Sequence, residues 1–187
     1  MIINQRMIAY INSLDMGNTP FLNEIEQEAL DSCVPIVRRE MQSFLKVLLA
    51  VKRPKQILEV GTAVGFSTLL FCEYAPEGAH VTTIEKYEKR IPIAKENFRR
   101  AGRESQITFL EGDAAEILAG LTETYDFIFM DAAKGQYIHF LPDVMRLLDA
   151  GWFLIMFCRM EILLSLIMPW SAETGRFTSG CGIICTS

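Results

Sequence analysis

The stretch Ile57-Leu58-Glu59-Val60-Gly61-Thr62-Ala63-Val64-Gly65-Phe66-Ser67 decides the fold of this chain. A short apolar run carries an acid, a turn bounded by two glycines follows, and a helix-like segment begins after the turn. This pattern is typical of a buried strand whose end lays backbone against a nucleoside-bearing cofactor. A tight strand-to-helix turn that needs positive φ explains the glycines equally well, so the stretch alone leaves both interpretations open.

Short apolar runs and helix-like segments alternate after this stretch. We expect strands at residues 57–60, 80–85, 107–111, 125–130 and 152–157, and helices at residues 66–74, 87–101, 113–118 and 137–148. Strands separated by helices form a parallel sheet with helices on both faces. The sequence therefore predicts an α/β fold with a Rossmann-like, doubly wound and mainly parallel sheet, which binds ligands beyond the carboxyl ends of its strands.

The first 50 residues read as N-terminal helices. One helix includes Leu22 and Ala29, with Asn23 as a possible cap. A second amphipathic stretch runs over residues 34–51, with Pro35 expected in its first turn. We predict a single domain made of N-terminal helices at 1–50, a cofactor-binding sheet at 56–157 and an aberrant tail at 158–187.

Composition limits the classes of function. The 187 residues carry a net charge of −5, which argues weakly against nucleic-acid binding by bulk electrostatics. The N-terminus shows no signal-peptide pattern, and the five cysteines lack paired metal spacing, so a cytoplasmic protein with reduced thiols is expected. The apolar run from Trp152 to Trp170 is interrupted by Arg159 and Glu161, so we do not expect a membrane span.

Two acids follow the second and third expected strands. Glu85 lies 24 residues after Gly61, a spacing at which an acid can accept both hydroxyl hydrogens of a ribose; the alternative is a solvated acid at a strand end. Asp113 follows the third strand, where it could cap the next helix or meet an adenine edge.

A third acid, Asp131, follows the apolar run of the fourth strand. A carboxylate at this place needs a positive partner. Lys134 could form a structural ion pair with it. Alternatively, Asp131 binds a hard cation such as Mg²⁺ or Ca²⁺, and Lys134 acts as a general base toward a substrate hydroxyl.

Together these motifs resemble class I S-adenosylmethionine-dependent methyltransferases. They are most similar to the cation-dependent O-methyltransferase family, which includes catechol and caffeoyl-CoA O-methyltransferases and bacterial tRNA hydroxyuridine methyltransferases. The motifs that carry the resemblance are E-V-G-T-x-x-G-x-S after the first strand, I-E after the second, G-D-A after the third and M-D-A-A-K after the fourth. They lie within residues 1–151.

The resemblance implies a role for each matching residue. The residues implied to hold the methionine part of the cofactor are Glu59, Gly61, Thr62 and Ser67. Glu85 would bind the ribose, Asp113 and Ala114 would lie along the adenine, and Val37 would also touch the cofactor. Asp131 would bind the cation beside the cofactor, and Lys134 would activate the acceptor hydroxyl. Members of this family form dimers, so the resemblance also implies a homodimer.

The chain departs from the family pattern after Gly151. The family continues with a strand and a D-N pair that completes the metal site, whereas this chain contains no D-N pair there. Back-translated and read one nucleotide earlier, the tail permits V-S-D-N-V-L-Q-D-G-D-I-I-E-S-H-Y, which restores that pair. We therefore hypothesise a frameshift near residues 150–152. Its consequences would be aberrant last strands, an aberrant closing helix and an incomplete Mg²⁺ site.

The functional prediction is an S-adenosylmethionine-dependent O-methyltransferase that transfers a methyl group to a metal-bound hydroxyl, with activity impaired by the altered tail. The acceptor would be a small phenol or catechol, or a tRNA hydroxyuridine. One alternative is a module that binds the cofactor without catalysis. Another is a nicotinamide-dependent dehydrogenase, which the absence of G-x-G-x-x-G disfavours.

Overall fold

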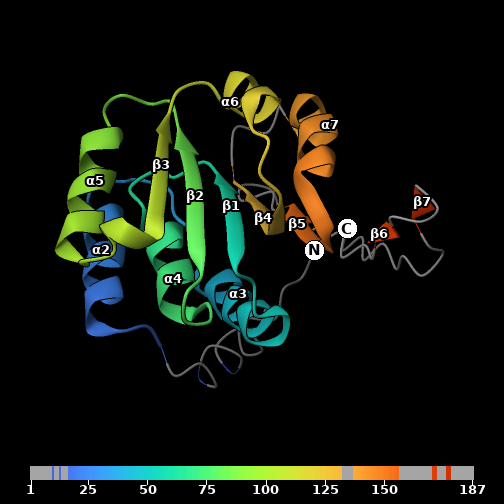
Figure 1. Ribbon diagram of the computed structural model, residues 1–187. Helices are drawn as coiled ribbons and strands as arrows, with labels where there is room; N and C mark the ends of the chain where they lie inside the picture. Colours follow the sequence, from blue (N-terminus) through green and yellow to red (C-terminus); the bar gives the residue numbers. More distant parts are fainter. Residues whose placement is uncertain are drawn as a thin grey trace, which may run out of the picture.

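Five parallel strands form the central sheet of the computed structural model, in the order β3-β2-β1-β4-β5 (Figure 1). The structure describes residues 17–131 and 137–155, together with Tyr10, Ser13 and the residue pairs 170–171 and 176–177. The strands are β1 (Gln56–Val60), β2 (His80–Glu85), β3 (Ile107–Glu111), β4 (Tyr125–Met130) and β5 (Leu148–Ile155). The strand order reverses between β1 and β4, and ligands of such sheets bind at this point, outside the carboxyl ends.

Six α-helices are described around this sheet. They are α2 (Pro20–Asp31), α3 (Arg39–Lys52), α4 (Phe66–Tyr74), α5 (Ile91–Arg100), α6 (Ala114–Gly120) and α7 (Tyr137–Leu147), with a short 3₁₀ helix η1 (Glu104–Gln106) before β3. Two further strands, β6 (Trp170–Ser171) and β7 (Arg176–Phe177), pair antiparallel with each other. The predicted α/β fold with a doubly wound parallel sheet is therefore confirmed.

The alternation of side chains along the strands divides the core into two layers. Ile57 and Phe129 pack with apolar residues of α2, α3, α4 and α5, whereas Leu58 and Met130 pack with residues of α6 and α7 (Figure 1). Successive side chains of a strand point to opposite faces, so helices on both faces bury most side chains of β1, β2 and β4, whereas the edge strand β3 is only partly covered. Glu59 follows the same alternation and lies on the α4 side, where it is fully buried.

Several predicted element boundaries need correction. Asn23 lies inside α2, and the hydroxyl of Thr19 caps this helix because Pro20 begins it. Pro35 precedes α3 and does not lie in its first turn, since that helix begins at Arg39. The helix expected at 87–101 begins at Ile91, and the strand expected at 152–157 begins at Leu148.

Within the described part of the chain, no helix combines the length and the apolar character needed to cross a membrane. Most of the tail after residue 155, including the interrupted apolar run, lies outside the described residues. The hypotheses of an aberrant closing helix and of a frameshift therefore remain predictions.

Candidate functional site

The turn that follows β1 has a left-handed backbone at three positions. Gly61, Ala63 and Gly65 have φ angles of 103°, 50° and 85°. The N–H groups of Gly61 and Thr62 both donate to the carbonyl of Ile84 on β2, at 3.0 and 3.2 Å, and the N–H of Gly65 donates to the carbonyl of Thr62 at 2.8 Å. The turn is thus tied to the neighbouring strand and closed on itself, and its need for positive φ is confirmed.

Gly65 is required for a second reason. A Cβ atom at this position would lie 2.5 Å from Cε1 of Phe98, a buried ring on α5. Non-bonded carbon atoms essentially never approach this closely, so a side chain at Gly65 would require the ring of Phe98 to shift. The glycine therefore permits both the backbone angle and the close approach of α5.

The carboxylate of Glu59 lies beneath the turn, surrounded by hydroxyl groups. Ser67 donates to it at 2.5 Å, Thr83 donates at 2.6 Å, and Thr68 also donates to it. Burial raises the pKa of Glu59 from 4.5 to about 7, although these hydrogen bonds lower it; the charge of Asp131 raises it further. Glu59 and Ser67 thus form an internal brace, and their contact with a cofactor remains a prediction.

Thr83 connects this brace to the turn. Its hydroxyl donates to Glu59 and lies 2.6 Å from the hydroxyl of Thr62. Because the single proton of Thr83 is directed to Glu59, Thr62 must donate to Thr83. Sequence reasoning identified Thr62 but missed Thr83, whose place opposite Glu59 follows from the register of β1 and β2.

Glu85, at the end of β2, accepts three backbone hydrogen bonds. One oxygen accepts the N–H of Ala63 at 2.7 Å, and the other accepts the N–H groups of Lys86 and Tyr87 at 2.9 and 2.8 Å. A carboxylate offers about four acceptor positions, so one remains, which is fewer than the two that both ribose hydroxyls would need. The contact of Glu85 with a ribose remains a prediction. Glu85 is 9% exposed, and the alternative of a freely solvated acid is therefore wrong.

Asp113 caps α6, accepting the N–H of Ala115 at 2.9 Å. This backbone bond, followed by an ion pair with Lys86 at 3.2 Å, holds its pKa below the ordinary value. The capping interpretation is confirmed, while contact of Asp113 and Ala114 with an adenine remains a prediction.

Val37 is buried in the core, and its carbonyl accepts a hydrogen bond from Gln42 at 2.8 Å, so its backbone is fixed. Its contact with the cofactor remains a prediction.

Asp131 directly follows β4, and its N–H donates to the carbonyl of Val60 at 2.9 Å. It therefore reaches the same edge of the sheet as the turn, as predicted. Lys134 lies outside the described residues, so the choice between an ion pair and a cation site stays open. Among the residues that the structure describes, no group of three or more His, Cys, Asp and Glu side chains could hold a metal ion.

Comparisons with known proteins agree with this geometry. The family model described as O-methyltransferase matches residues 12–158 of this chain. The chain belongs to the O-methyltransferase family. Membership of this family disfavours the alternative of a nicotinamide-dependent dehydrogenase.

Named relatives lie within the same family. The catechol O-methyltransferase of Niastella koreensis is 34% identical over 60% of this chain and 52% of its own length. The caffeoyl-CoA O-methyltransferase of Populus kitakamiensis is 33% identical over 58% of this chain and 48% of its own length. The chain thus spans about half the length of these relatives. The SAH-bound methyltransferase of Podospora anserina has a TM-score of 0.77 and 26% identity, covering 83% of this chain and 71% of that chain.

Proposed function

We propose that this chain binds S-adenosylmethionine at the turn after β1 and serves methyl transfer to a hydroxyl oxygen. The observation that carries the proposal is the junction of this turn with Glu85. The carboxylate of Glu85 holds the left-handed residue Ala63, so the glycine turn and the acid at the end of β2 form one unit. Family membership and the SAH-bound relative from Podospora anserina support this assignment.

The residues present fit this cofactor. Gly61 and Thr62 would face its methionine part, Glu85 has one acceptor position left for the ribose, and Asp113 and Ala114 follow β3 where an adenine would lie. Bound S-adenosylmethionine would supply an electrophilic methyl group on a sulfonium. Glu59 and Ser67 would act from beneath the turn, since their polar groups bind each other.

The acceptor must lose its hydroxyl proton as its oxygen forms a bond to the methyl carbon and the carbon–sulfur bond breaks. We propose Lys134 as the base that takes this proton, supported by its place three residues after Asp131 in M-D-A-A-K. This edge of the sheet would also hold the acceptor oxygen in line with the carbon–sulfur bond that breaks.

A divalent cation such as Mg²⁺ has less support. Asp131 is the proposed ligand, but the described residues do not complete a metal site around it. A single carboxylate with water molecules should bind Mg²⁺ weakly. We therefore propose that this chain is impaired relative to proteins with a full ligand set.

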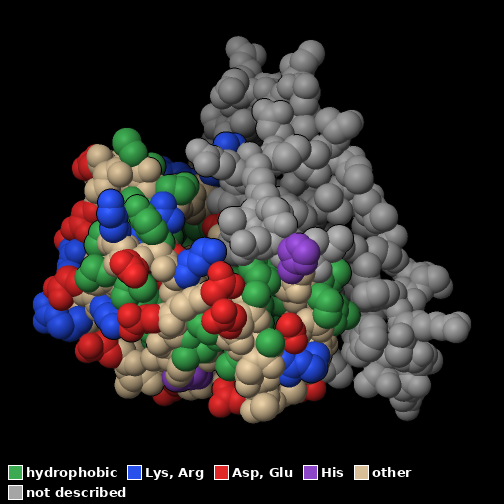
Figure 2. Space-filling model, turned by 90° about the horizontal axis from the view of Figure 1, so that it is seen from above, with side chains coloured by type: hydrophobic (Ala, Val, Ile, Leu, Met, Phe, Trp, Pro, Cys, Tyr) green, Lys and Arg blue, Asp and Glu red, His purple; other side chains and the backbone are tan. Residues whose placement is uncertain are grey.

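For the acceptor, we favour a small phenol or catechol. The relatives named catechol and caffeoyl-CoA O-methyltransferase support this class, and the net charge of −5 gives no general attraction for RNA. Figure 2 shows acidic and basic side chains interspersed on the described part of the visible face. A tRNA hydroxyuridine is the second acceptor to test, and a homodimer is proposed from the resemblance alone.

A second candidate function is a module that binds the cofactor without catalysis. The observation that favours it is a contrast within the described residues. The turn after β1 is held by hydrogen bonds to Glu85 and Thr83, whereas no group of three or more His, Cys, Asp and Glu side chains there could hold a metal ion. In this case S-adenosylmethionine would bind with ordinary affinity, and no acceptor would be methylated.

Calorimetry with S-adenosylmethionine, with Mg²⁺ and with a chelator, tests the first part of the proposal. Methylation of catechol and of tRNA that carries unmethylated hydroxyuridine tests the second. A chain whose tail is replaced by the shifted reading V-S-D-N-V-L-Q-D serves as the matched comparison. We expect both chains to bind the cofactor and the restored chain to turn over faster with Mg²⁺. Absence of cofactor binding by both chains would refute the proposal, and equal Mg²⁺-dependent turnover would refute the impairment.

A further inference from the structure

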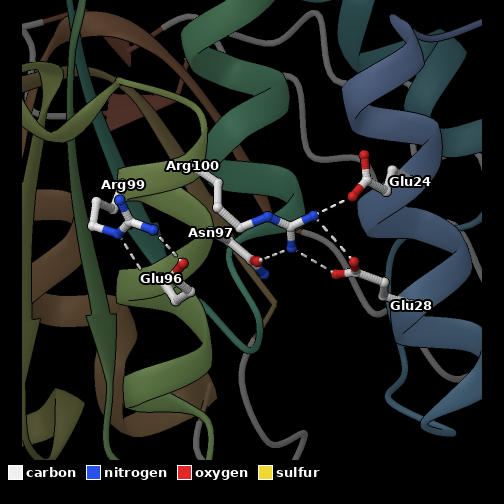
Figure 3. Close-up of polar contacts among 6 residues, drawn as sticks. All are labelled: Glu24, Glu28, Glu96, Asn97, Arg99 and Arg100. Atoms are coloured by element: carbon white, nitrogen blue, oxygen red, sulfur yellow. Dashed lines mark hydrogen bonds and ion pairs between the residues drawn. The ribbon is translucent and has the colours of Figure 1, made fainter.

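A chain of polar contacts runs from α2 through Arg100 to Asn97 on α5 (Figure 3) and continues from Asn97 to the turn after β1. The guanidinium of Arg100, on α5, forms two bonds with Glu28, at 2.9 and 3.1 Å, and a further bond with Glu24. The same group donates to Oδ1 of Asn97 at 3.2 Å. One side chain therefore binds two acids of α2 and one amide of its own helix.

Asn97 continues the chain to the turn. Its side-chain nitrogen donates to the carbonyl of Val64 at 2.8 Å, and the residue is only 3% exposed. An arginine has donors and no acceptor, so the amide atom that faces Arg100 must be the oxygen. The NH₂ group is then directed toward Val64. Arg100 thus fixes the orientation in which Asn97 can bind the turn.

Helix α5 contacts two consecutive residues of the turn. Asn97 binds the carbonyl of Val64, and the ring of Phe98 fills the space beside Gly65. The first contact is directional and the second is steric. Together with the bonds of the turn to Ile84 and Glu85, they restrict its movement.

We propose that Asn97 and Arg100 are positioning residues for cofactor binding, which fix the turn through Val64. The inference rests on the proposed binding of S-adenosylmethionine at this turn. Neither residue belongs to the motifs of the family resemblance. The neighbouring Arg99 provides an internal comparison, because its two bonds to Glu96 stay within α5 (Figure 3).

Two substitutions separate the roles in this chain of contacts. Asn97→Asp keeps the size of the side chain and the contact with Arg100, but turns an acceptor toward the carbonyl of Val64. Arg100→Met keeps an unbranched side chain and removes every donor, so Asn97 loses its fixed orientation. Arg99→Met is the matched control for lost charge on α5, and Asn23→Asp is the control for the amide substitution on an exposed side chain.

We expect the dissociation constant of S-adenosylmethionine, measured by calorimetry, to rise about tenfold in Asn97→Asp and about fivefold in Arg100→Met, as loss of one hydrogen bond near a charged group implies. Both controls should bind like the unsubstituted chain. Melting temperatures define a temperature at which every variant is folded, and all affinities are measured there. A purely structural role would lower the melting temperatures and leave these affinities unchanged.

Hydrogen exchange of the Gly65 amide, measured without cofactor, is the independent readout. This N–H closes the turn on Thr62, so a loosened turn should exchange it faster in Asn97→Asp and Arg100→Met than in the controls. Unchanged affinity and exchange in both variants would overturn the inference. If the unsubstituted chain does not bind S-adenosylmethionine, the proposed function fails, and unchanged exchange would then overturn the positioning role separately.

Discussion

The carboxyl edge of the sheet has two halves that differ in how their polar side chains are supported. At β1 and β2, Glu59 accepts three side-chain hydroxyls, Glu85 accepts three backbone N–H groups, and Asn97 reaches the turn from α5. At β4, the N–H of Asp131 donates to the carbonyl of Val60. The described residues include no group of three or more His, Cys, Asp and Glu side chains that could hold a metal ion.

The two halves depend on different parts of the sequence. The residues of the first half, where we propose that the cofactor binds, lie between β1 and α6 and form hydrogen bonds with one another. The second half, at β4, is where we propose that the acceptor binds. The family resemblance implies that its metal site needs a D-N pair after Gly151, and this chain has no D-N pair there. We therefore expect substitutions in the first half to affect folding and cofactor binding together, and substitutions in the second half to affect neither strongly.

The largest effect should come from Gly65→Ala. The left-handed backbone costs about 1–2 kcal/mol for a non-glycine residue, and overpacking against Phe98 adds about 1–3 kcal/mol. We expect the free energy of unfolding to fall by about 4 kcal/mol in denaturant titrations. Gly102→Ala is the control, because its φ is +63° and nothing lies near its Cβ position; it should lose only about 1 kcal/mol. Equal losses at both glycines would show that the contact with Phe98 is unimportant.

The next effect is a pH dependence caused by Glu59. Because its folded pKa is raised to about 7 from 4.5, the folded state holds a proton that the unfolded state releases between these values. Stability should therefore fall as pH rises from about 4.5 to 7, by about 3 kcal/mol, and then stay level with respect to this group.

Glu59→Gln removes this proton and tests the assignment. The difference in unfolding free energy between the unsubstituted chain and Glu59→Gln should change with pH over that range, because other groups cancel in the comparison. Glu96→Gln on the exposed surface of α5 is the control and should not reproduce the fall. A difference that is constant between pH 4.5 and 7 would mean that Glu59 is ionised throughout.

A smaller effect is expected for Thr83→Val, which deletes the hydroxyl between Glu59 and Thr62 while keeping the shape of the side chain. The loss should be about 1–2 kcal/mol in unfolding free energy, since two buried partners lose a hydrogen bond. Thr83→Ser should recover most of it. Thr108→Val removes an exposed hydroxyl bonded to His80 and should cost far less. An unchanged unfolding free energy in Thr83→Val would mean that the hydroxyl of Thr83 does not couple the turn to Glu59.

The elements of the fold could be predicted because their signals are local. Short apolar runs alternating with helical periodicity located the five strands, and the glycines of the turn marked the change from strand to helix. The capping error had an equally local cause. Thr19 directly precedes Pro20, and a proline at the first helical position indicates where a helix begins more strongly than Asn23 does.

The supporting residues could not be predicted, because their roles depend on contacts between distant segments. Thr83 meets Glu59 through the register of β1 and β2, which the strand boundaries alone do not determine. Asn97 meets Val64 only after α5 has packed on the turn. Lys134 lies outside the described residues, so its role as a base remains a prediction.

The smallest effect should come from Asp131→Asn, and it also joins the two halves. The unfolding free energy should change by no more than about 1 kcal/mol at neutral pH, because the amide keeps the size of the side chain. The negative charge of Asp131 contributes to the raised pKa of Glu59, so removing it should move the Glu59-dependent fall in stability to lower pH. Any weak enhancement of cofactor binding by Mg²⁺ should also disappear from calorimetric titrations. If the pH midpoint does not move, Asp131 does not influence the brace, and the two halves of the edge are electrostatically independent.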